Sequence, residues 1–191
     1  LYGVFRPAPF FRAYLIAFEF CLGLSLGCMV VMMIRHLTGG AWGLYLRPIL
    51  EAGASLVPLS AVFFLPLLIG LRYLYPWYIG GARWVPDALP EHQMQWFNPV
   101  FFAVRALFYF VVWTGFAFFL NLGPRGANVP PFEEPPRRFR VVSAIGIAVY
   151  GLTITFASFD WSMSLDAPWF STIYGAMYAG GHLLAGFAFS V

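Results

Sequence analysis

The ionisable side chains inside or beside long apolar runs of the sequence include Glu19, Asp160, Asp166 and His182. A charged side chain at membrane depth costs about 2.5–3.5 kcal/mol on insertion scales, so each such residue needs a partner or a purpose. Because carboxylates and imidazoles exchange protons, these four residues are candidates for a proton path. Two alternatives stay open: the aspartates can cap a helix that starts near Trp169, and His182 can hydrogen-bond across a glycine-lined helix contact.

Arg105 offers a second kind of site, an ion pair within the membrane. It lies about six residues into its apolar run, and Glu19 lies about as far into another run that enters from the same side. At about 1.5 Å per residue both side chains are roughly 9 Å deep. Glu19 and Arg105 are therefore expected to meet if their helices are neighbours. Such a pair is either structural or sets the proton affinity of Glu19.

The residue inventory argues against a cofactor or a catalytic centre on this chain. The sequence has three histidines and two cysteines. His36 and His92 lie at or beyond the ends of apolar runs, so the facing pair that a membrane haem needs is missing, and an iron–sulfur cluster needs about four cysteines. Cys21 and Cys28 share one apolar run, where thiols pack as small hydrophobic groups. No phosphate or dinucleotide loop is present. We expect no catalytic residue, no metal site and no cofactor here.

The composition indicates the class of protein to which these side chains belong. Of 191 residues, 61% are hydrophobic, 20% aromatic and 10% charged, and the mean hydropathy is +0.76. Soluble domains are about 45–50% apolar and about 25% charged. These values exclude a soluble enzyme with an ordinary core, a disordered chain and a nucleic-acid-binding module. The chain is predicted to be an integral membrane protein.

Five apolar runs are long enough to cross about 30 Å of hydrocarbon as helices. Continuous runs favour helices over the short alternating segments of a β-barrel. We therefore predict an all-α polytopic transmembrane bundle, a single domain over residues 1–191. The expected spans are 13–34, 54–71, 99–120, 141–159 and 169–191.

The segments between these runs carry proline and aromatic residues. Pro58 and Pro66 are expected to kink the second span, and residues 42–51 to form a short interfacial link. Trp77, Trp84 and Trp96 suit the lipid headgroup layer. The proline-rich stretch 121–140 is expected to be an extended loop.

Arginine placement predicts the orientation. All eleven basic residues are arginine: six lie on the side of the turn after the first span, four lie on the other side, and Arg105 lies inside a span. Cytoplasmic loops carry the excess of positive charge, so the N-terminus is expected outside and the turn at Thr38 in the cytoplasm. The sequence begins without methionine and ends inside an apolar run, which we interpret as a fragment, about half, of a longer protein.

Several strings resemble one family of membrane subunits. They are HLTGGAWG at 36–43, FNP at 97–99, TFASFDWSMSLD at 155–166 and WFSTIYG at 169–175. In this order they resemble the ActF-type membrane subunits of alternative complex III, a bacterial quinol:cytochrome c oxidoreductase, which are relatives of the NrfD/polysulfide-reductase membrane subunits. The chain departs from the family pattern at Arg35, Pro168 and His182, where histidine, histidine and glutamine are common.

The resemblance implies a subunit of about ten helices in the bacterial inner membrane, of which this chain is the first bundle. It implies a structural role with a suspected proton path, and no activity of the chain by itself. Its partners would be an NrfD-like quinol-oxidising sister subunit that holds the quinol, an iron–sulfur protein with its clusters and a multihaem cytochrome c with its haems. The alternatives are a quinol-binding NrfD-type membrane anchor and a fragment of a secondary transporter.

Overall fold

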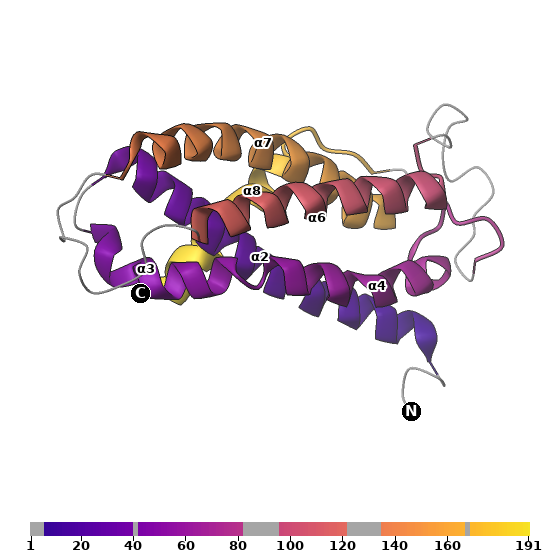
Figure 1. Ribbon diagram of the computed structural model, residues 1–191. Coiled ribbons are helices and arrows are strands. Elements are labelled where there is room, and N and C mark those ends of the chain that lie inside the picture. The colour runs from indigo at the N-terminus through magenta and orange to yellow at the C-terminus, as the bar shows by residue number, and fades with distance from the viewer. Residues whose placement is uncertain (1–5, 40–41, 82–95, 122–134, 167–168) are drawn as a thin grey trace.

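The computed structural model describes residues 6–39, 42–81, 96–121, 135–166 and 169–191. These residues form a helical bundle without a strand among them (Figure 1). The predicted all-α bundle is therefore confirmed. The elements are α2 (Pro7–Thr38), α3 (Trp42–Ala54), α4 (Val57–Leu74), α6 (Pro99–Asn121), α7 (Arg137–Trp161), the 3-10 turn η1 (Met163–Leu165) and α8 (Tyr174–Ser190).

Four helical segments in the described part of the chain are long and apolar enough to cross a membrane. They are Pro7–Thr38, Tyr45–Leu74, Pro99–Asn121 and Arg137–Leu165. The outward faces of α4 and α6 are apolar, as expected for a surface in contact with lipid tails. The exposed side chains there include Leu59, Val62, Phe63, Leu65, Ile69, Val100, Val104, Leu107, Phe108, Val111 and Phe118.

The fifth predicted span, 169–191, is helical only from Tyr174 to Ser190, a length of 17 residues. Before it the chain turns: Trp169 N–H donates to the Asp166 carbonyl, and Tyr174 N–H donates to the Ser171 carbonyl. Serine favours such turns because its side chain competes for backbone hydrogen bonds. At 1.5 Å per residue α8 is about 25 Å long, shorter than the predicted span.

One expectation about the second span needs correction. Pro58 is the second residue of α4, a position where the missing N–H has no helical partner to lose, so it starts the helix instead of kinking it. Pro66 does lie inside α4. Residues 42–51 belong to a helix, α3, with Leu50 and Ala54 buried against the bundle.

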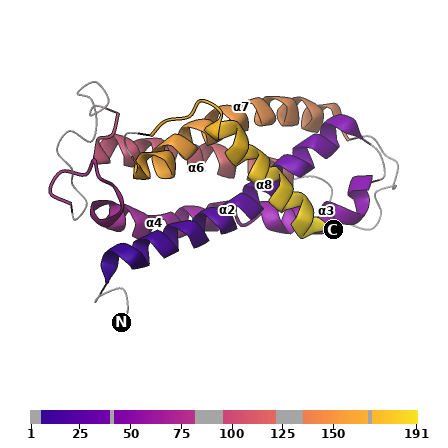
Figure 2. The same ribbon diagram turned by 180° about the vertical axis from the view of Figure 1, so that it is seen from behind.

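Helix α2 is the centre of the bundle, and α3, α4, α7 and α8 all pack against it (Figure 2). It crosses α8 where Gly27 meets Gly186. A Cβ atom built on either glycine would collide with the backbone of the opposite helix. Small residues allow two membrane helices to approach this closely, so the crossing depends on both glycines.

An aromatic cluster fills the end of the bundle where α2 begins. The Trp161 ring lies 5.0 to 6.1 Å, between centroids, from the rings of Phe18, Phe64, Tyr109, Phe110 and Trp113. Apolar and aromatic side chains of this size supply most of the packing in such a core. The cluster packs α2, α4, α6 and α7 together at this end of the bundle.

Two aromatic residues of the link after α4 join this cluster. Tyr75 and Trp77 are buried, and the Tyr75 hydroxyl donates to the Trp161 carbonyl over 2.9 Å. Burial raises the pKa of Tyr75, which keeps this hydroxyl protonated as a donor. Trp77 therefore packs inside the bundle, its depth in the headgroup layer stays a prediction, and Trp84 lies outside the described residues.

Candidate functional site

Arg105 and Asp160 form a buried ion pair near one end of the bundle. Arg105, on α6, donates from Nε to Asp160 Oδ2 over 2.8 Å and from Nη2 to Oδ1 over 2.7 Å. Asp160, on α7, is 0% exposed, and Arg105 is 7% exposed. Paired charge-assisted bonds of this geometry are among the strongest polar contacts in proteins. The pair fixes α6 against α7.

Two further donors complete the surroundings of the Asp160 carboxylate. Trp96 Nε1 donates to Oδ1 over 2.9 Å, and the Tyr109 hydroxyl donates to Oδ2 over 3.0 Å. The Arg105 guanidinium lies over the rings of Trp96 and Phe101, 4.2 and 4.4 Å from their centroids, which attracts the cation to both ring faces. Each Asp160 oxygen thus has two donors, which makes this residue a structural anchor.

The structure gives Arg105 a different acidic partner from the predicted one. Glu19 was expected to pair with Arg105, but Asp160 occupies that place. The reason is that α7 continues to Trp161 and carries Asp160 inside the bundle, whereas α2 makes few contacts with α6. The predicted Glu19–Arg105 pair is corrected to Arg105–Asp160.

Asp166 lies apart from this cluster. Its side chain is exposed at the end of η1, and its backbone carbonyl accepts from Trp169 N–H. Because α8 begins at Tyr174, Asp166 does not cap a helix start at Trp169, as one alternative expected. A place for Asp166 at the mouth of a proton path stays a prediction.

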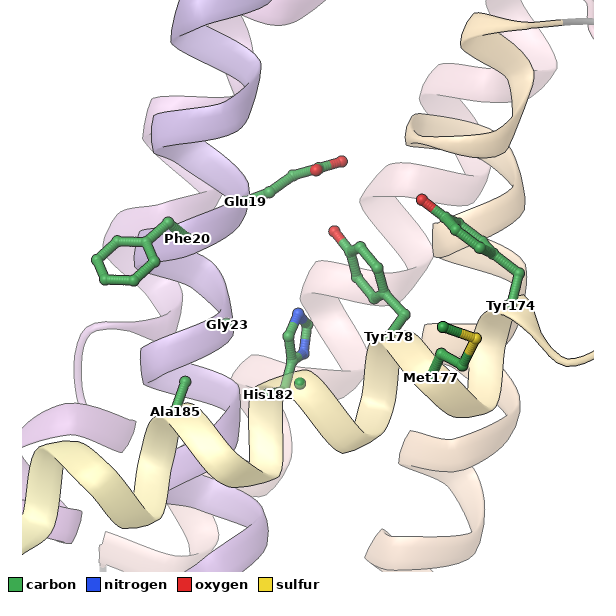
Figure 3. A pocket seen from close by; sticks show the side chains of 9 residues that line it. Glu19, Phe20, Gly23, Tyr174, Met177, Tyr178, His182 and Ala185 are labelled. Carbon is green, nitrogen blue, oxygen red and sulfur yellow. The ribbon is translucent and has the colours of Figure 1, made fainter.

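Glu19 has neutral partners among the described residues. Ser162 Oγ donates to Glu19 Oε1 over 2.5 Å. The buried hydroxyl of Tyr178 points toward Glu19 (Figure 3) and also lies near Ser162, without a well-formed hydrogen bond to either. A carboxyl group among hydroxyls alone can be held charged or neutral. Glu19 is therefore better placed than Asp160 to gain and lose a proton.

His182 lies deeper in the bundle, next in line after Tyr178. It is 6% exposed, and its ring centroid lies 4.7 Å from that of Tyr178, one turn earlier on α8. Its Nδ1 is 3.0 Å from the hydroxyl of Tyr150 on α7. The other side of the ring rests on Gly23 of α2, where a Cβ atom would be 2.8 Å from His182 Cδ2. Three helices thus hold this imidazole.

A pocket of about 380 Å³ opens between α2 and α8 and connects these groups. Glu19 projects into the space beside it from α2, while Tyr174, Tyr178 and His182 project from α8 (Figure 3). Its walls are mostly apolar and include Phe20, Met177 and Ala185. The polar groups of this lining are the Glu19 carboxyl, the tyrosine hydroxyls and the His182 imidazole, so any water in the pocket has its partners there.

A second polar pair occupies the opposite end of the bundle. His36 Nδ1, on α2, lies 3.0 Å from Ser143 Oγ on α7, and both residues are buried. Nearby on α3, Arg47 Nε donates to Glu51 Oε1 over 2.6 Å. Ser143 and Tyr150 are seven residues apart on α7, so they face the same side of that helix. Polar groups therefore line one face of α7 from both ends.

The described residues hold no group of three or more histidine, cysteine or acidic side chains that could bind a metal ion. The chemistry within reach is proton exchange along a line of five side chains, which are Glu19, Ser162, Tyr178, His182 and Tyr150. These side chains come from α2, α7 and α8 and from the segment that follows α7.

The sequence analysis missed the hydroxyl groups of this line. Tyr178 and His182 have the spacing of one helical turn, and Ser143 and Tyr150 have the spacing of two. Those spacings were a usable signal. Ser162 and Trp96 had no such signal, because their partners Glu19 and Asp160 are 143 and 64 residues away in the sequence.

Comparison with protein-family models found no match to the chain, and no curated protein sequence matches it.

Proposed function

We propose that this chain is a membrane subunit of a bacterial respiratory quinol:electron-acceptor oxidoreductase, of the alternative complex III type, and that it carries protons. The proton role rests on the line of five side chains described above. Ser162 donates to Glu19 at one end, His182 pairs with Tyr150 at the other, and Tyr178 lies between these two pairs. The resemblance of the string at 155–166 supports the choice of complex, because Ser162, the donor to Glu19, belongs to that string.

Each residue has a distinct task in this proposal. Glu19 takes up a proton, and Ser162 orients its carboxyl group. Water in the pocket relays the proton past the Tyr178 hydroxyl to His182, since protons pass along hydrogen-bonded chains. Tyr150 holds the Nδ1 side of His182 and so leaves the rest of the ring facing the line. The Arg105–Asp160 pair keeps the end of α7 in register beside Glu19.

Electron transfer is assigned to other chains of the complex. The partners would be an NrfD-like sister subunit that oxidises the quinol, an iron–sulfur protein and a multihaem cytochrome c. This division agrees with the inventory of this chain, which offers three histidines and two cysteines.

The pocket favours a second candidate function, a quinol-binding membrane anchor. A space of about 380 Å³ between α2 and α8, lined by Glu19, two tyrosines and His182, falls in the size range of small-molecule sites, which is about 300–1,000 Å³. A quinol in this pocket would donate its hydroxyl protons to the carboxyl group or the imidazole. Binding of a quinol analogue in this pocket would favour this candidate over the first.

The first experiment is purification of the tagged protein from its native membrane with its partners. A stoichiometric multihaem cytochrome c, seen in the dithionite-reduced spectrum, together with an iron–sulfur protein is the expected result. A colourless protein that purifies alone would overturn the choice of complex. Substrate-dependent flux by that protein would instead support a transporter.

The proton role is tested on the purified complex in vesicles. Glu19→Gln should keep quinol-driven haem reduction and lose proton movement per electron. Glu51→Gln is the matched control, because Glu51 is an acidic residue paired with Arg47 outside the line. Proton movement unchanged by Glu19→Gln would reject the path.

A further inference from the structure

The polar groups along the buried face of α7 are interrupted near its middle. His36 and Ser143 form a pair on one side, and His182 and Tyr150 form a pair on the other. Ser143 and Tyr150 are two helical turns apart, which is about 10.5 Å at 1.5 Å per residue. Hydrogen bonds span about 2.7–3.2 Å. A proton can therefore cross this interval only through intervening water or another polar group.

The interval is closed by the side chain of Met33, which comes from α2. Gly146 lies between Ser143 and Tyr150 on α7, and a Cβ atom at Gly146 would lie 2.7 Å from Met33 Cε and 3.0 Å from its Sδ. Phe116 of α6 closes the same spot, 3.3 Å from that Cβ position. Met33 and Met29 are 0% exposed, and Met32 is 2% exposed. The thioether thus lies directly on the glycine.

This packing leaves no favourable place for water. A buried water needs about two to four polar partners, while a thioether sulfur is only a weak acceptor. Gly146 provides the room that Met33 fills, since any larger residue there would push the methionine away. At this contact the side chains that α2 and α6 bring to the backbone of α7, Met33 and Phe116, are both apolar.

We infer that Met33, seated on Gly146, is a hydrophobic barrier that separates the Tyr150–His182 pair from the His36–Ser143 pair. This inference rests on the proposed proton path and adds a residue that controls it. The barrier prevents a continuous proton leak across the bundle at rest. Net transfer then requires that Met33 leave Gly146 during turnover.

The test is a passive proton leak, measured in vesicles that hold the complex and an imposed pH gradient but no quinol. Met33→Gln replaces the thioether with an amide of similar length and should raise the leak several-fold. Met33→Leu keeps an apolar side chain of similar volume and should match the wild type. Met33→Ser is the second polar variant, in case the glutamine protein does not fold.

The inference further requires that the leak use the path described above. Adding Glu19→Gln to Met33→Gln should bring the leak back to the wild-type level. A leak in Met33→Leu equal to that in Met33→Gln, or a polar variant as tight as the wild type, would overturn the barrier. If polar variants stay tight while Glu19→Gln alone abolishes turnover-linked proton movement, the barrier is wrong and the proton path stands. If Glu19→Gln also has no effect, both are wrong.

Discussion

Two carboxyl groups lie near the same end of the bundle in opposite environments. Asp160 accepts four hydrogen bonds, two of them from a guanidinium. Glu19 accepts one hydrogen bond from Ser162 and has Tyr178 nearby. A buried charge with a full set of donors contributes to the fold, whereas a carboxyl group without a cationic partner is free to change its protonation. Asp160 is thus the acid that stabilises the fold, and the proposed proton role falls to Glu19.

Asp160→Asn is expected to destabilise the protein strongly. The substitution leaves the Arg105 guanidinium buried without its counter-charge, and breaking such a pair from one side costs about 3–5 kcal/mol. The measurement is the thermal unfolding temperature in detergent. The double variant Arg105→Gln with Asp160→Asn removes both charges and should recover part of the loss. Equal losses in the single and double variants would contradict the pair.

Glu19→Gln is expected to lower stability much less than Asp160→Asn does, or to raise it, because no guanidinium loses its counter-charge. The amide oxygen of glutamine can still accept from Ser162, and the cost of a charge at membrane depth disappears. The same unfolding measurement applies, with Asp160→Asn as the comparison. A loss as large as that of Asp160→Asn would show that Glu19 has a charged partner in the folded protein.

At the scale of elements, glycine placement decides how α8 meets α2. Gly27 and Gly186 lie at the contact, and Gly23 makes room for the His182 ring. The adjacent pair before His182, which suggested a glycine-lined contact in the sequence, does not form it: Gly180 and Gly181 have open space around their Cα atoms. The position of His182 therefore depends on glycines of the opposite helix.

Gly27→Ala and Gly180→Ala make a matched pair of substitutions. The new methyl group at Gly27 would collide with the carbonyl of His182, whereas the one at Gly180 meets nothing within 4 Å. Overpacking typically costs about 1–3 kcal/mol, so Gly27→Ala should lower the unfolding temperature. Gly180→Ala should leave it unchanged or raise it slightly, because alanine favours helix. Similar shifts in both variants would contradict the crossing described here.

The elements were largely predictable, and their partners were not. The length and hydropathy of the apolar runs predicted α2, α4, α6 and α7. A run of that length in a membrane can satisfy its backbone hydrogen bonds within itself only as a helix. The third run, 99–120, matches α6 within a residue. The partner of Arg105 depended on which helices touch and on α7 extending past Phe159 to include Asp160. Neither fact is local in sequence.

The bundle has two distinct ends, and the start of α2 and the end of α8 lie at opposite ones (Figures 1 and 2). One end holds the aromatic cluster, the Arg105–Asp160 pair and Glu19. The other holds His36, Arg35 and the Arg47–Glu51 pair of α3. In the proposed path, protons enter at one end and leave at the other. The proposed barrier must then lie between the two ends, and Met33 does so, because it contacts α7 at Gly146.

Arginine counts predict which end faces the cytoplasm, and cysteine labelling tests the prediction. Ile79 and Thr38 are exposed near opposite ends of the bundle, and the sequence has two cysteines, Cys21 and Cys28, that can be replaced first. A membrane-impermeant maleimide applied to intact spheroplasts should modify Ile79→Cys and spare Thr38→Cys, because the arginine-rich end stays inside. Permeabilised membranes, in which both cysteines should react, are the control. Labelling of Thr38→Cys alone in intact spheroplasts would reverse the orientation and make Glu19 the cytoplasmic entry of the path.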